Sequence, residues 1–156
     1  MRIEQLTITP PDGIDCSFGV VRGEGEDRVP KILVASFSGI YPDGSRGNSH
    51  GHYIAYSTMH GLAAIEPWCL ILDFRELDYK WGNTLLLVFD HVSRFMDDAE
   101  EPTMRFPIAV VTSEKCRDAF LSLVTRTGDG PPEWHFNDIE LAIEYAIREA
   151  SAWIGA

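Results

Sequence analysis

The histidines between residues 48 and 60 are the side chains whose spacing comes nearest to a metal or acid–base centre. The segment "NSHGHYIAYSTMH" supplies His50, His52 and His60, and a separation of eight residues puts the last two on one face of a helix. A metal ion would need a further ligand, such as His91 or an acidic residue from elsewhere. The segment lacks an HExxH motif, and His50 and His52 straddle the expected start of a helix. We therefore interpret these histidines as solvated or capping residues. An enzyme built on His50, His52 and His60, with or without a metal, is the alternative function.

The serine and cysteine candidates for a nucleophile are each incomplete as motifs. The stretch "ASFSG" offers Ser36 and Ser38, but Ala35 stands where a GxSxG motif has its first glycine. Cys116 lies near a helix start, which can lower the pKa of a thiol, yet its spacing with Phe120 favours burial. The sequence thus predicts no catalytic residue, no cofactor and no metal site, and it favours a protein that is not an enzyme.

Composition bounds the class of protein and its partners. A chain of 156 residues with 45% hydrophobic residues suits a single domain, residues 1–156, with a substantial core. The net charge of −11 argues against nucleic acid and anionic membranes as partners, and it permits a basic protein. Three separated cysteines, no secretory signal and no apolar run of about 20 residues predict a cytoplasmic location.

Hydrophobic patterning predicts the order of elements. Two short strands, "MRIEQLTIT" and "IDCSFGVV", are joined by the turn "PPDG", and "KILVASFSG", "WCLILDF" and "FPIAVVTS" read as inner strands. Helices are expected from residue 48 or 49 to about residue 64, after "DYKWGN", after residue 113, and from Asn137, with a short strand "EWHF" before the last. The order β-β-β-α-β-α-β-α-β-α predicts an α/β fold with a mixed, largely parallel sheet and about four helices.

This order resembles the STAS domains, the anti-sigma-factor-antagonist-like family. The resemblance runs from about Lys31 to Ile147 and rests on "ILVASFSG", "LILDFRELDYKWGN", "IAVVTSEKCRDAFLSL" and "HFNDIELAIEYAI". It implies a strand that ends in an aspartate, here Asp73, then a corner and a helix. A crotonase-like half-domain has a similar string of elements and is the second fold hypothesis.

The corner after "LILDF" is the predicted recognition surface. In the family that the chain resembles, a phosphorylatable serine stands at this helix start, where a helix N-terminus stabilises phosphate. This chain has no serine there, so the resemblance leaves Thr84 as the candidate for phosphorylation. A cation and an aromatic residue beside a turn suit a protein contact. The predicted partner-binding residues are Tyr79, Lys80, Trp81 and Asn83, together with Asp97, Asp98, Glu100 and Glu101 of the acidic loop "DDAEEPT".

These features together predict a non-enzymatic protein-binding module. The resemblance implies a regulator in a bacterial partner-switching pathway, with a regulatory kinase or sigma-pathway protein as partner. An acidic immunity or inhibitor protein that binds a basic toxin is the other form of this hypothesis, since a charge of −11 would attract a basic surface.

Overall fold

A five-stranded mixed sheet forms the centre of the molecule. The structure, a computed structural model, describes residues 1–22, 29–97 and 104–155. The strands are β1 (Ile14–Val20), β2 (Ile32–Ile40), β3 (Cys69–Asp78), β4 (Ile108–Val111) and β5 (His135–Phe136), in the order β1-β2-β3-β4-β5. β1 runs antiparallel to β2, and the other neighbours are parallel. The predicted mixed, largely parallel sheet is confirmed.

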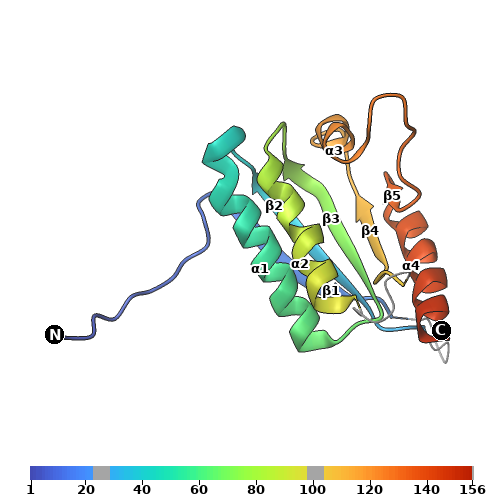
Figure 1. The fold of residues 1–156 in the computed structure, drawn as a ribbon, viewed down its shortest axis with the longest axis horizontal. Coiled ribbons are helices and arrows are strands. Elements are labelled where there is room, and N and C mark those ends of the chain that lie inside the picture. The colour runs from blue at the N-terminus through green and yellow to red at the C-terminus, as the bar shows by residue number, and fades with distance from the viewer. Residues whose placement is uncertain (23–28, 98–103, 156) are drawn as a thin grey trace.

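Four helices cover the sheet unequally. They are α1 (Asn48–Ile65), α2 (Leu87–Met96), α3 (Arg117–Val124) and α4 (Ile139–Ile154), and the short 3-10 helices η1 (Gly44–Gly47) and η2 (Asn83–Leu86) lead into α1 and α2. Figure 1 shows α1 and α2 side by side over one face, α3 at the end where the parallel strands finish, and α4 alone on the other side of β4. The four predicted helices are confirmed.

The two faces of the sheet have different cores. Alternate strand residues such as Leu70, Leu72 and Phe74 belong to a large aromatic and aliphatic cluster under α1 and α2. The intervening residues, including Ile71 and Ala109, pack against α4. The helix meets the sheet through a row of fully buried alanines, Ala142, Ala146 and Ala150.

The start of α4 differs by one residue from the prediction. The N-cap is Asp138 rather than Asn137, and its carboxylate accepts hydrogen bonds from the backbone N–H groups of Glu140 at 2.8 Å and Leu141 at 3.4 Å. Ile143 and Ile147 flank the alanine row and are only partly buried, because the small residues bring the helix axis close to the sheet.

The predicted strand over residues 1–9 is wrong. These residues form no strand and extend away from the domain (Figure 1). The proposed hairpin would close at Pro10 and Pro11, and proline has no N–H to donate where the ladder must begin. The element order is therefore the predicted one without its first strand. Within the described residues, no helix is long and apolar enough to span a membrane.

Candidate interaction surface

Backbone hydrogen bonds tie together three loops at the carboxyl ends of the parallel strands. The N–H of Tyr41, just after β2, donates to the carbonyl of Asp78 at 2.9 Å, and the N–H of Gly44 donates to the carbonyl of Trp81 at 3.3 Å. The N–H of Tyr79 donates to the carbonyl of Lys115 at 3.4 Å. Because each bond joins segments that are far apart in sequence, the corner after β3 is held on both sides.

Glycines allow these loops to approach closely. A Cβ atom on Gly44 would lie 2.6 Å from a ring carbon of Trp81, so the indole ring rests directly on the backbone of η1. A Cβ atom on Gly51, in the first turns of α1, would lie 2.8 Å from the carbonyl oxygen of Thr84. Gly82 has φ +144°, a conformation that side chains rarely allow, and this bend leads the chain into η2. The corner is consequently a packed and fixed piece of backbone.

Tyr79 lies under the corner and not on it. Its side chain is 2% exposed, its ring meets that of Tyr41 edge to face at 5.1 Å, and its hydroxyl donates to the carbonyl of Gly82 at 3.1 Å. Burial raises the pKa of Tyr79 to about 12. Tyr79 was among the predicted partner-binding residues. The structure corrects its place, because β3 continues to Asp78 and carries this ring into the core.

Trp81 and Ile40 form the exposed apolar part of the corner. The Trp81 side chain is 61% exposed and that of Ile40 is 62% exposed. Lys80 directly precedes Trp81, lines a hollow together with Ile40, and makes an ion pair of 3.1 Å with Asp78. We call these four residues, Ile40, Asp78, Lys80 and Trp81, the corner surface. Two hollows meet along Ile40 and Asp78, one of about 300 Å³ towards Arg46 and one of about 480 Å³ towards Lys115.

Asn83 and Thr84 continue the corner towards α1. Asn83 is exposed, and Thr84 is partly buried. The Thr84 hydroxyl donates to the side-chain oxygen of Asn48 at 2.6 Å, which links η2 to the first residue of α1. The side chain that the resemblance suggests for phosphorylation therefore has a structural partner in this state.

The acidic loop is described only at its first residue. Asp97 accepts hydrogen bonds from the backbone N–H of Phe106 at 2.7 Å, from Arg105 at 3.1 Å and from the Ser93 hydroxyl. Burial would raise the pKa of Asp97, but these hydrogen bonds and the charge of Arg105 hold it below the usual value. Its carboxylate thus fastens the end of α2 to the chain before β4. The other predicted residues of this loop, Asp98, Glu100 and Glu101, lie outside the described residues.

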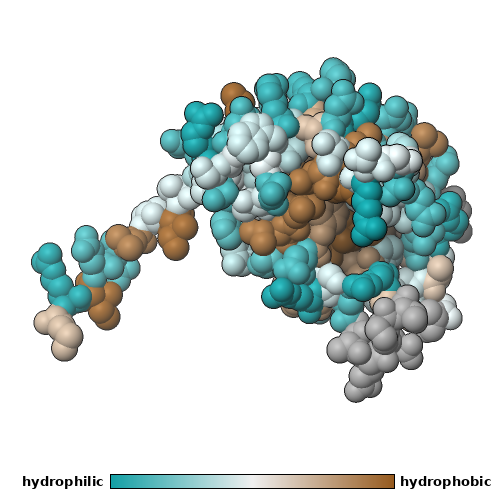
Figure 2. All heavy atoms as spheres, turned by 45° about the horizontal axis from the view of Figure 1, so that its top comes forward, coloured by the Kyte–Doolittle hydropathy of each residue, from teal (hydrophilic) through white to brown (hydrophobic). Residues whose placement is uncertain are grey.

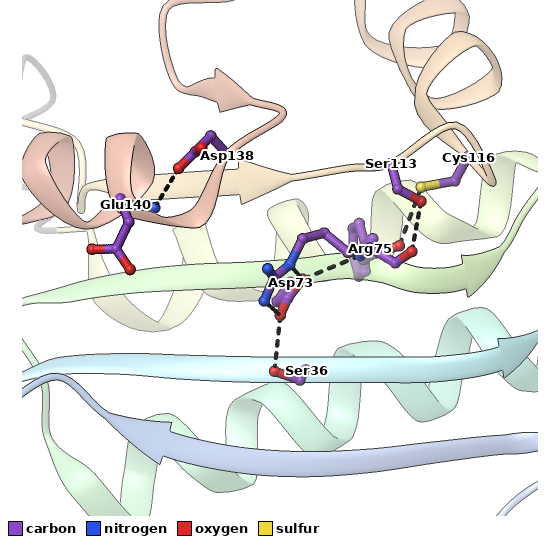
Figure 3. A network of polar contacts seen from close by, with 8 residues as sticks. Ser36, Asp73, Arg75, Ser113, Cys116, Asp138 and Glu140 are labelled. Carbon is purple, nitrogen blue, oxygen red and sulfur yellow. Dashed lines mark hydrogen bonds and ion pairs between the residues drawn. The ribbon is translucent and has the colours of Figure 1, made fainter.

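Asp73 is a structural carboxylate in the middle of β3. Figure 3 shows it between Ser36 and Arg75. Arg75 donates from Nε and Nη2 at 2.9 Å each and from its backbone N–H at 3.1 Å, and the Ser36 hydroxyl lies at 3.4 Å. Burial would raise the pKa of Asp73, but the hydrogen bonds and charge of Arg75 bring it below the usual value. The resemblance implied that the strand ends at Asp73, but β3 continues to Asp78. The main partner of Asp73 is Arg75, a side chain on the same strand.

The nucleophile candidate Cys116 has a structural partner as well, and Ser113, close to it in the chain, makes a similar contact. The Cys116 thiol donates to the carbonyl of Phe74 at 3.2 Å, and Ser113 donates to the carbonyl of Arg75 at 2.6 Å (Figure 3). Burial raises the pKa of Cys116, which opposes the thiolate that a nucleophile requires. Both side chains fasten the start of α3 to the backbone of β3.

The structure does not gather the three histidines of α1 into one centre. His50 is buried, with Nε2 2.8 Å from the carbonyl oxygen of Asp12 and Nδ1 3.3 Å from the Ser49 hydroxyl. His52 and His60 are exposed, and His52 stacks on Tyr56. Within the described ranges, no group of three or more histidine, cysteine, aspartate or glutamate side chains could hold a metal ion.

The chain is similar in structure to a protein that has been solved by crystallography. No family profile and no curated protein matches the sequence. A crystal structure of an anti-sigma factor antagonist from Mycobacterium paratuberculosis is similar over 89% of this chain and 98% of that chain, with 14% sequence identity and a TM-score of 0.49.

Proposed function

We propose that this protein is a non-enzymatic protein-binding module that docks a partner through the corner surface. The observation that carries the proposal is Trp81, whose side chain is 61% exposed although its backbone is fixed and its ring lies on Gly44. Tryptophan is enriched among the residues that contribute most to protein association. A side chain that is already held in place loses less conformational entropy when a partner covers it.

Charge at the corner surface favours a partner of mixed polarity. Lys80 pairs with Asp78, and close by Lys115 pairs with Glu76 at 2.7 Å. These pairs balance locally, so the net charge of −11 resides mainly on other parts of the chain. The partner that fits is therefore a protein with an apolar recess for Trp81 and Ile40, bordered by hydrogen-bonding groups. This chemistry suits a regulatory protein better than a strongly basic toxin.

A role in partner switching would place its control at Thr84. A phosphate on this hydroxyl would end the hydrogen bond to Asn48 and add about two negative charges three residues from Trp81. Such a change would alter both the join between η2 and α1 and the charge beside the corner surface. This finer role follows from the order of elements and the place of Thr84, and it is separate from the docking proposal.

Affinity measurements with one matched control test the docking proposal. The partner is first isolated from the native host on the wild-type protein and then purified. We expect Trp81→Ala to raise the Kd for that partner by about 30-fold, as expected for a dominant interface residue. Trp68→Ala is the control, because Trp68 is 43% exposed at the opposite end of β3. Equal Kd values for the wild type and a folded Trp81→Ala protein would move the interface away from the corner.

A further inference from the structure

The extended N-terminal segment leaves three aliphatic side chains without cover. In residues 1–9, which we call the arm, Ile3 is 90% exposed, Leu6 82% and Ile8 95%. Figures 1 and 2 show the arm leaving the domain, with hydrophobic residues along it. Isoleucine, leucine and threonine make up most of its second half, which is a composition that suits a strand. The arm therefore has the character of a strand that lacks a neighbour.

The molecule also has a free strand edge. β1 pairs with β2 on one side, and within the described residues no strand pairs with its other side. The sequence of β1, "IDCSFGV", has no proline, lysine or arginine to discourage pairing. Phe18 packs towards Gly61 of α1 but stays 45% exposed, because no strand of the described residues extends the sheet beyond it. A further strand at this edge would cover the Phe18 ring.

The connection between the arm and β1 opposes pairing within one chain. Pro10 and Pro11 lack N–H groups and hold the residues before them extended. The next residues are fastened to the domain, since the carbonyl of Asp12 lies 2.8 Å from His50 Nε2 and the carbonyl of Gly13 accepts from Ile40 N–H at 2.8 Å. The arm is thus directed outwards. The arm can pair with the β1 edge of a second copy, because pairing between two chains needs no tight turn between the arm and β1.

Charge favours this part of the chain for self-association. Each copy carries −11, so two copies repel one another. Within the arm, Arg2 and Glu4 cancel, and β1 carries only Asp15. Contact between arm and β1 therefore brings together two of the least charged segments of an acidic protein.

We propose that two copies exchange arms, each adding its arm as a strand to the free edge of β1 in the other copy. The main-chain groups of β1 that face outwards would gain partners, and Leu6 and Ile8 would lose their exposure to water. The exchange needs none of the four corner-surface residues, although the arm joins the domain beside Ile40, whose N–H donates to the carbonyl of Gly13. It predicts a dimer whose stability increases with salt, because salt screens the repulsion between the acidic domains.

Sedimentation equilibrium on the full chain tests the proposal. We expect a concentration-dependent dimer, and a double variant Leu6→Lys/Ile8→Lys should raise its Kd by about 100-fold or more. The matched control is Gln5→Lys/Thr7→Lys, which adds the same charge at polar positions of the arm and should leave a dimer. Added positive charge lowers the repulsion between acidic copies, so loss of the dimer in the first variant would come from lost apolar burial.

A second measurement locates the contact. In a mixture of labelled and unlabelled protein, isotope-filtered NMR should show nuclear Overhauser transfer of magnetisation between the Ile8 methyl protons of one copy and the Phe18 ring protons of the other. A wild-type protein that stays monomeric at millimolar concentration would overturn the proposal. So would a dimer that persists in Leu6→Lys/Ile8→Lys, or a dimer in which no such transfer occurs.

Discussion

The corner surface and the layer of α4 both depend on residues with little or no side chain, and they use them differently. At the corner, Gly44 lets the Trp81 ring rest on the backbone of η1 while that ring stays exposed, and Gly51 lets α1 approach Thr84 closely. Under α4, a row of alanines brings the helix onto the sheet, and these alanines are themselves fully buried. Close packing therefore holds an exposed side chain in place at the corner, whereas under α4 it buries the contact between helix and sheet. Substitutions should separate these roles, since changes under α4 act on stability and changes on the corner surface act on association.

The largest effect is expected under α4. Ala146 is fully buried against the sheet, and Ala146→Asp would place a carboxylate there without a partner. We expect the free energy of unfolding to fall by about 3–5 kcal/mol, measured by denaturant titration. The control is Leu141→Asp, on the exposed side of the same helix, which should change stability by less than about 1 kcal/mol. Similar losses for both variants would contradict the proposed packing of α4.

The next largest effect is expected at Gly51, where a buried substitution close to the corner should lower both stability and partner binding. Gly51→Ala would set a Cβ atom 2.6 Å from the Thr84 methyl group and 2.8 Å from the Thr84 backbone, so α1 and η2 must separate. We expect a loss of about 1–3 kcal/mol in the free energy of unfolding, together with weaker partner binding because Trp81 follows the displaced backbone.

The control for this substitution is Gly130→Ala. A Cβ atom on Gly130 would meet nothing within 4 Å, so stability and binding should both stay near those of the wild type. A Gly51→Ala protein that is as stable as the control would show that the corner yields more readily than its close contacts indicate.

The sequence predicted the fold better than it predicted the roles of single residues. Continuous apolar runs such as "KILVASFSG" identify β2 to β4, because strands covered on both faces need no polar alternation. The strand predicted over residues 1–9 failed because propensity takes no account of the donors that Pro10 and Pro11 lack. Tyr79 and Trp81 stand two residues apart, which would place them alike in a regular strand. They differ because Gly82 turns the chain and Tyr41, from another loop, packs over Tyr79.

A smaller effect on stability is expected at Asp73, a polar residue on the face of the sheet that α4 covers. Asp73→Asn would remove the ion pair with Arg75 and weaken its hydrogen bonds, and we expect a loss of about 1–2 kcal/mol at neutral pH. The folded state lowers the pKa of Asp73, so its contribution is complete above the unfolded value of about 3.9 and is lost as the pH falls through the folded value. The difference between wild type and Asp73→Asn in denaturant titrations should therefore be constant from pH 7 to about 5 and shrink below about 4. A difference that does not change with pH would show that Asp73 contributes through packing and not through its charge.

The smallest effect on stability is expected at Lys80, on the corner surface itself. Both members of its ion pair with Asp78 are well exposed, and such pairs contribute about 0–1 kcal/mol. Lys80→Glu should therefore lower the free energy of unfolding by less than about 1 kcal/mol, because water solvates the new carboxylate. Partner binding should change more than stability does, since Lys80 lines a hollow with Ile40 and directly precedes Trp81, and the reversal leaves two like charges where a neutral pair stood. Binding would weaken for a partner that presents an acidic group at this point and strengthen for one that presents a basic group.

Measuring the Kd at low and at high salt separates this charge effect from any change in shape, because salt screens only the former. Unchanged affinity at both salt concentrations, in a folded protein, would show that the partner covers Trp81 without reaching Lys80, and the interface would then extend towards Asn83 and α1.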